Sequence, residues 1–217
     1  VSVKVMRGDV DVTENYSFGT HIDGNLKVTP RNVVLISDFN EKVYDGTALE
    51  DKHVEVLGDG FVNDSDASWT VTGSQTDVGS SKNTFTYTLK DSVKGNYVVT
   101  KYEGTLTVTP KDITVTADDV SKVYGAQDPE LIYKVSGNGD LDVSGIVVDL
   151  EREAGEDVAE YDIIASGVKL QGNYSIKFVG GKFTINKAAL TITADYKTKV
   201  YGDGDPEFTA TASGLQF

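Results

Sequence analysis

The side chains that could carry out catalysis are few and scattered in this sequence. Its two histidines are His21, in an N-terminal segment, and His53, which follows Lys52 in a polar stretch. A catalytic histidine needs partner groups placed by the fold, and neither histidine has a counterpart in another part of the repeat pattern described below. The chain has no cysteine, which excludes disulfides, thiolate metal sites and cysteine catalysis. We therefore expect a chain that is not an enzyme, with no catalytic residue and no cofactor.

Closely spaced acids are the more promising chemical feature, because Ca²⁺ binds clustered carboxylate and carbonyl oxygens. Three Asp-x-Asp pairs occur, at 64–66, 140–142 and 203–205. None of them fits the twelve-residue calcium loop with its terminal Glu, and acids in turns are ordinarily solvated. We therefore assign no metal ligand, and whether Ca²⁺ binds stays open.

A covalent crosslink is the other chemistry that the repeated residues allow. A lysine near the start of a unit and an asparagine near its end could form an amide with loss of ammonia, either Lys42 with Asn96 or Lys122 with Asn173. The sequence places no acid to catalyse that bond, so the crosslink remains an open alternative. The sole tryptophan, Trp69, lies in an alternating stretch and is expected in the core rather than on a sugar-stacking surface.

The charge balance narrows the classes of partner. The 217 residues include 34 Asp and Glu against 20 Lys and Arg, a formal charge of −14. Without a basic face, the chain is not expected to bind nucleic acid or an anionic membrane surface. The longest apolar run, Val33 to Ile36, is far shorter than the roughly 20 residues needed to span a bilayer.

Internal repeats organise the whole sequence. Lys-Val-Tyr occurs at 42–44, 122–124 and 199–201, and Asn-Tyr occurs at 15–16, 96–97 and 173–174. The repeat predicts one full unit at 31–110 and another at 111–187. Residues 1–30 match the C-terminal part of a unit, and residues 188–217 match its N-terminal part. We therefore expect a chain that begins and ends inside modules, as a segment of a longer tandem array.

Strand periodicity predicts the fold class. Residues 84–90 alternate threonine with Phe85, Tyr87 and Leu89, and about seven such strands fit into residues 111–187. This cadence is typical of small immunoglobulin-like Greek-key β-sandwich modules, so we predict an all-β protein. The alternative is a β-grasp-like module with a short helix. Strand order is left open.

Turn chemistry adds two local predictions. The dipeptides at 23–24, 103–104 and 180–181 separate the last two strands of each unit and predict two-residue hairpins. The tyrosine of Asn-Tyr is either a tyrosine corner, bonded to the backbone a few residues upstream, or an ordinary tyrosine at the edge of the core. Junctions after Pro110 and after Asn186 are too short for a flexible linker, so we expect a stiff rod.

The repeated motifs resemble known families. Lys-Val-Tyr-Asp-Gly-Thr at 42–47, with Gly-Asn-Tyr at 95–97 and Leu-Thr-Val-Thr-Pro at 106–110, resembles the YDG-type repeats of bacterial surface proteins. Tyr-Gly-x-x-Asp-Pro at 124–129, with Phe-x-Gly-Gly-x-x-x-Ile at 178–185, is similar to the MBG-type (YGX) repeats. Ala159 departs from the pattern, which commonly has Gly there. No catalytic residue belongs to either pattern.

The resemblance implies an extracellular location on a bacterial cell surface, with the signal and anchor outside this segment. It implies a non-catalytic stalk of an adhesin-like protein, contacted by neighbouring modules of the same chain. Two alternatives remain: the modules bind host glycan or mucin directly, or they are accessory modules of a secreted hydrolase.

Overall fold

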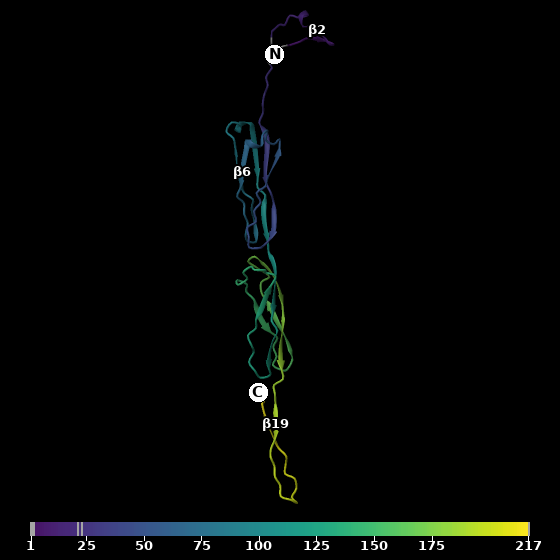
Figure 1. Ribbon diagram of the computed structural model, residues 1–217, viewed down its shortest axis with the longest axis vertical. Helices are drawn as coiled ribbons and strands as arrows, with labels where there is room; N and C mark the ends of the chain where they lie inside the picture. The colour runs from purple at the N-terminus through teal and green to yellow at the C-terminus, as the bar shows by residue number, and fades with distance from the viewer. Residues whose placement is uncertain (1–2, 21, 23, 217) are drawn as a thin grey trace.

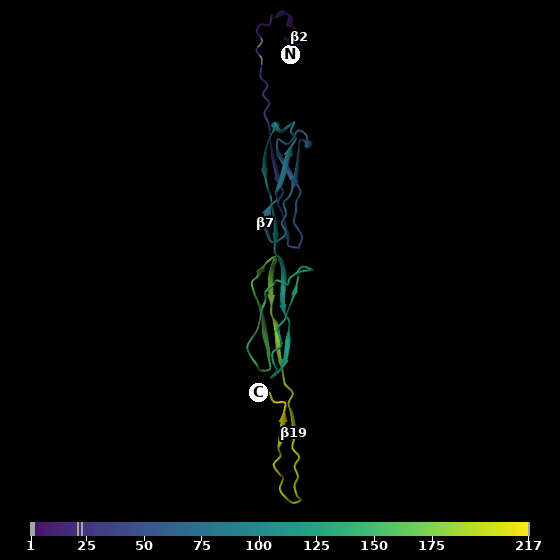
Figure 2. The same cartoon turned by 90° about the vertical axis from the view of Figure 1, so that its left-hand side faces the viewer.

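Strands make up nearly all of the regular structure in the computed structural model, which describes residues 3–20, 22 and 24–216. They follow one another along a single long axis (Figures 1 and 2). The described residues contain no α-helix, only short 3₁₀ turns at Thr13–Asn15, Asp64–Asp66 and Lys94–Asn96. The prediction of all-β, sandwich-like modules is therefore confirmed, and the helix of the β-grasp alternative is wrong. In the part of the chain described, no helix is long and apolar enough to cross a membrane.

Residues 31–110, which we call the first module, form two layers of strands. The strands are β3 (Arg31–Ser37), β4 (Asn40–Val43), β5 (Val54–Gly58), β6 (Ala67–Val71), β7 (Gly79–Lys82), β8 (Phe85–Leu89), β9 (Tyr97–Tyr102) and β10 (Thr105–Thr109). One layer has the order β5-β3-β9. The other contains β4-β10-β7 and the pair β6-β8, and it is continuous because β7 runs into β8 after two residues.

Residues 111–187, the second module, repeat this plan. The strands are β11 (Lys111–Ala117), β12 (Val120–Val123), β13 (Tyr133–Ser136), β14 (Asp149–Arg152), β15 (Glu160–Ser166), β16 (Leu170–Gln171), β17 (Tyr174–Val179) and β18 (Gly181–Asn186). The two sheets have the orders β13-β11-β17-β16 and β12-β18-β15-β14. Each strand ladder between described residues joins strands on the same side of Pro110.

The first and last strands of each module run parallel to each other along its full length. In the first module, Arg31 lies opposite Tyr97 and Val43 lies opposite Thr109, a separation of 66 residues at both ends (97 − 31 and 109 − 43). In the second module, β11 with β17 and β12 with β18 also keep one register. Each pair therefore bends together from one layer into the other. The chain consequently enters a module at one end and leaves it at the opposite end.

The predicted hairpins are wrong, because the glycine dipeptides mark this bend. Glu103 and Gly104 connect β9 to β10, yet β9 pairs with β3 while β10 pairs with β4 and β7. In the same way, residues 180–181 lie where β17 ends and β18 begins, and these two strands belong to different sheets. A Cβ atom at Gly104 would lie 2.2 Å from the Asp38 carbonyl oxygen. The glycine is needed for close approach of two strands and not for a turn. The dipeptide at 23–24 includes Asp23, which lies outside the described residues.

Alternating strands bury one face in each module, as the periodicity predicts. In β10, Leu106 and Val108 are buried between threonines. The fully buried aromatic rings of Phe85 and Phe183 lie at the centre of the first and second module, respectively. The core prediction for Trp69 is wrong, since this side chain is 36% exposed.

In the described residues, each terminal segment contains one strand pair. Near the N-terminus, β1 (Met6–Arg7) pairs with β2 (Val10–Asp11). At the C-terminus, β19 (Thr191–Ala194) pairs with β20 (Ala210–Ser213) in the arrangement of β11 and β13. Among the described residues these two strands form a sheet of their own, in which Ile192 is 69% exposed. The division of the chain into modules at 30, 110 and 187 remains our interpretation of the repeat.

Candidate functional site

The histidine and the acids that the sequence analysis considered for chemistry have ordinary structural partners in the structure. His53 Nδ1 lies 2.9 Å from Asp38 Oδ2 on the surface, and this hydrogen bond raises the pKa of the imidazole. His21 lies outside the described residues. Among the acids, the Asp66 carboxylate accepts a hydrogen bond from the Tyr97 hydroxyl at 2.6 Å. Asp142 caps the backbone N–H of Ser144 at 2.9 Å. Within the described part of the chain, no group of three or more His, Cys, Asp or Glu residues could hold a metal ion.

The candidate crosslink residues are not brought together. Asn173 lies beside Lys111, whose N–H donates to its carbonyl at 3.0 Å at the start of the second module. Lys122 lies opposite Ile185 towards the other end, on β12. In the first module, Asn96 adjoins the start of β9 and Lys42 lies opposite Val108 near the end of β10. The parallel strands therefore place each proposed pair at opposite ends of its module.

The lysine of each Lys-Val-Tyr motif instead holds the loop that follows it. Lys42 Nζ donates to Asp45 Oδ1 at 2.7 Å and to the Thr47 carbonyl at 2.6 Å. Lys199 Nζ donates to Asp205 Oδ1 at 2.5 Å. Hydrogen bonds from Lys42 and Thr47 lower the pKa of Asp45 far below its ordinary value. The repeated lysine is thus explained as an anchor for a turn.

In the second module the same lysine belongs to a four-charge network. Lys122 Nζ contacts Asp128 Oδ1 at 2.7 Å and Glu156 Oε2 at 2.5 Å, and its side chain is only 5% exposed. Arg152 binds the same two carboxylates at 2.6 Å and 2.5 Å. Its guanidinium lies 4.7 Å from the centre of the Phe183 ring. Two cations and two anions therefore close one side of the core without a net charge, an arrangement suited to stability.

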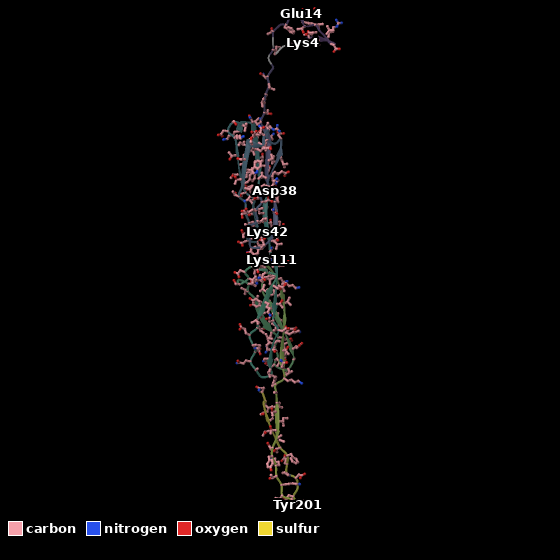
Figure 3. The ribbon with its side chains drawn as sticks, in the orientation of Figure 1. Lys4, Glu14, Asp38, Lys42, Lys111 and Tyr201 are labelled. Atoms are coloured by element: carbon pink, nitrogen blue, oxygen red, sulfur yellow. The ribbon has the colours of Figure 1, made fainter. Side chains whose placement is uncertain are left out.

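The candidate functional site is the junction between the two modules, where Tyr44 crosses from the first to the second. Its ring meets the Tyr174 ring edge to face, with centroids 5.8 Å apart and planes at 86°. Tyr44 packs against the Leu49 cluster of its own module and also against the cluster around Ile113 in the next. Lys42 and Lys111 mark the two sides of this junction in Figure 3.

Polar contacts fix the same junction. The Asn173 side chain donates from Nδ2 to Asp77 Oδ1 at 2.9 Å, and its Oδ1 accepts the Val78 N–H at 2.8 Å. One amide thus binds both a side chain and the backbone of the preceding module. Because Asn173 also adjoins Lys111 through its backbone, these bonds connect the two modules directly across the Pro110 link.

Two of the Asn-Tyr tyrosines, Tyr97 and Tyr174, are buried and hydrogen bonded, but not as tyrosine corners, whereas Tyr16 is 57% exposed. Tyr174 donates to the Asp142 carbonyl at 2.7 Å, and Tyr97 donates to Asp66 and accepts the Val62 N–H at 2.9 Å. These partners lie 31 to 35 residues upstream, in the segments that precede β6 and β14. Burial raises the pKa of Tyr174.

A tyrosine that bonds to the backbone four residues upstream does occur, at a position that the sequence analysis did not single out. Tyr161 donates to the Asp157 carbonyl at 3.0 Å, and its ring lies against Gly155. The spacing Asp157 to Tyr161 was visible in the sequence, but the first module has serine at the corresponding place, so the repeat did not highlight it.

Comparison with known proteins identifies part of this architecture. The family model of the MBG domain (YGX type) matches residues 113–184 and 190–216. These ranges cover most of the second module and of the C-terminal segment, so the MBG-type resemblance is confirmed there. No curated protein and no solved structure matches the chain. The YDG-type resemblance of residues 31–110 stays a prediction.

Proposed function

We propose that this chain is a non-catalytic stalk segment of a bacterial cell-surface, adhesin-like protein, which holds other domains away from the cell. MBG-type repeats are consistent with a surface-associated repeat module, and this supports an extracellular location. The proposal depends on one observation above all. The first and last strands of each module are parallel, so each module adds its full length to the chain.

The gain in length per module follows from the strand geometry. Residues 31–43 of the first module run beside residues 97–109 over its whole length. At ~3.3 Å per residue, these 13-residue strands extend about 40 Å. The junction residues Tyr44 and Asn173 then resist bending between successive modules, because they hold the two ends in contact. Reach and stiffness are therefore the properties that the fold provides.

Small-angle X-ray scattering of the full chain tests this function. The two modules and the C-terminal hairpin alone make a straight array about 130 Å long, so the radius of gyration of the full chain should be at least ~37 Å, against ~17 Å for a compact protein of this length. We expect the larger value and a distance distribution typical of a rod. A value near that of a compact protein, or a distribution typical of a freely bending chain, would contradict the proposal.

Binding measurements with the same full chain address the alternative function. A stalk should show no saturable binding to a glycan array or to immobilised mucin. Saturable binding that is retained at physiological salt would assign the modules a direct role in adhesion and displace the stalk proposal.

A further inference from the structure

Both modules have a hollow at their N-terminal end, built from equivalent residues. In the second module a hollow of about 340 Å³ is lined by Asp142, Val143, Ile146, Asn173 and Tyr174, together with Tyr44 of the first module. In the first module a hollow of about 440 Å³ is lined by Val62, Asn63, Asp66, Asn96 and Tyr97. The buried tyrosine and the asparagine before it belong to the repeated Asn-Tyr motif in each case.

The structure shows which side chain of the preceding module forms a wall of the second hollow. The Tyr44 ring, which follows Lys42 and Val43, lies edge to face against Tyr174. Close packing continues at Gly46, where an added Cβ would lie 2.9 Å from Leu141 of the second module. At the edge of the hollow, the Asn173 side chain donates to the Asp77 carboxylate and accepts the Val78 N–H. An aromatic ring and a neighbouring loop from the preceding module therefore pack against this end and form one side of the hollow.

The first hollow has the same construction, but among the described residues its lining includes no ring from a preceding module, and the ring that meets Tyr97 belongs to the first module itself. Phe61 meets the Tyr97 ring edge to face at 5.1 Å, and the Tyr97 hydroxyl is held by Asp66 and Val62. Asn96, the counterpart of Asn173, is exposed on its rim. Residues 28–30 enter beside the hollow, as residues 108–110 enter the second module. By the register of the repeat, the positions equivalent to Tyr44 and Asp77 fall before residue 1.

The three Lys-Val-Tyr tyrosines differ in exposure according to what each contacts; we call the hollow with its Asn-Tyr pair a socket. Tyr44, which has a complete module after it, is half-buried. Tyr124, which is followed only by the β19–β20 hairpin, is 37% exposed. Tyr201, at the tip of the C-terminal hairpin in Figure 3, is fully exposed at 104%. Tyr44, which contacts an Asn-Tyr socket, is thus the most buried of the three.

We propose that the hollow at the N-terminal end of the first module is a binding site for the Lys-Val-Tyr tyrosine of another module of this kind. The proposal rests on the proposed stalk function and adds the recognition rule by which modules join. The Tyr of one unit inserts against the Asn-Tyr tyrosine of the next, and the asparagine then binds the Asp-Val pair of the unit that supplied the ring. The recognised chemistry is an aromatic ring beside a carboxylate and a free backbone N–H.

A chain with one added module tests the site directly. A second copy of residues 111–187 is inserted between Pro30 and Arg31, so that its Lys-Val-Tyr motif faces the first hollow and every original residue is kept. Hydrogen exchange is then measured by mass spectrometry on peptides that cover residues 93–97, which occur once in this chain. We expect exchange there to slow by about tenfold relative to the original chain, because contact with the inserted module suppresses local opening.

Matched variants of the inserted copy identify the ring as the cause. Replacing its tyrosine with alanine (Tyr124→Ala in that copy only) should return exchange at residues 93–97 to the original rate, whereas Tyr124→Phe should keep the protection. Unchanged exchange at residues 93–97 in a chain whose inserted copy is folded would overturn the proposal.

The original chain supplies a test that needs no insertion. Tyr44→Ala should speed exchange at residues 171–174, where the second socket loses its ring, and leave residues 93–97 unchanged. Equal exchange at residues 171–174 in both chains would also overturn the proposal. Scattering separates this outcome from failure of the stalk function, because a chain can remain extended even if the tyrosine does not hold the joint.

Discussion

Gly104 lies directly against the backbone of Asp38, and a Cβ atom at this glycine would be 2.2 Å from the Asp38 carbonyl oxygen. This contact marks the point where the two parallel strands of the first module bend together into the second layer. Ser37, buried beside it, accepts the Gly104 N–H at 3.0 Å and donates to the Asn83 carbonyl at 2.5 Å. Because backbone atoms form the contact, a side chain at 104 has no space.

Gly104→Ala should therefore destabilise the first module strongly. We expect a loss of about 3 kcal/mol in the free energy of unfolding, since the strand pair must separate to admit the methyl group. Urea unfolding followed by fluorescence measures it, because Trp69 is the sole tryptophan and lies in the first module. Gly95→Ala is the matched control, because nothing lies within 4 Å of its added Cβ. That control should change stability by less than about 0.5 kcal/mol, and equal losses in the two variants would show that the bend tolerates a side chain.

The same glycine shows what sequence reasoning could and could not reach. Alternation in residues 105–109 correctly predicted a strand with Leu106 and Val108 inside. The preceding Glu103-Gly104 predicts a hairpin, which is wrong. Glycine occurs both where a turn requires positive φ and where two strands approach closely, and the dipeptide alone does not distinguish the two. The distinction depends on the neighbouring strand 66 residues away, which local sequence does not identify (104 − 38).

The junction was predictable in its parts but not in its contacts. The repeat revealed Lys-Val-Tyr and Asn-Tyr as motifs. The contact between the two motifs could not be predicted, because Tyr44 and Tyr174 are 130 residues apart in the chain (174 − 44) and lie in different modules. A repeat shows which residues matter in each unit, whereas a contact between units depends on how the units stack.

Removing the two Asn-Tyr hydroxyls should have unequal effects. Tyr174→Phe loses one hydrogen bond to a backbone carbonyl and should cost about 1 kcal/mol. Tyr97→Phe should cost more, because it also leaves the Asp66 carboxylate, 5% exposed, without its phenol donor. Hydrogen exchange of β9 peptides measures the loss in Tyr97→Phe, and exchange of β17 peptides measures the loss in Tyr174→Phe. Tyr102→Phe, with a 57% exposed ring, is the control and should have no effect. A larger loss for Tyr174→Phe than for Tyr97→Phe would contradict the role given to Asp66.

The stability of the second module should fall in acid. Hydrogen bonds from Arg152 and Lys122 lower the pKa of Asp128 from its ordinary 3.8, and bonds from the same two residues lower the pKa of Glu156 from 4.5. Because folding favours the ionised carboxylates, their contribution is complete above these ordinary values and is lost as the pH falls below them. Glu156 is 68% exposed and screened by solvent, so Asp128 should supply most of the effect.

Asp128→Asn tests this pH dependence. The variant should lower the stability of the second module at pH 7 and make it less dependent on pH between 5 and 2, as measured by exchange of β17 and β18 peptides. Asp140→Asn, in an exposed turn of the same module, should keep the original slope. An unaltered slope in Asp128→Asn would mean that the four-charge network does not couple to folding.

The direction of an applied force should decide how strongly a module resists unfolding. When the first module is pulled from positions 30 and 110, the parallel strands β3 and β9 are loaded from opposite ends, so the hydrogen bonds between them share the force. When it is pulled from positions 30 and 95, both strands are held at the same end, and their bonds break one after another. The chain has no cysteine of its own, so pairs of introduced cysteines can attach the handles for single-molecule force measurements. We expect a clearly higher unfolding force for Pro30→Cys with Pro110→Cys than for Pro30→Cys with Gly95→Cys. Equal forces in the two geometries would show that the strand pair does not bear the load, and would remove the mechanical basis for a stalk.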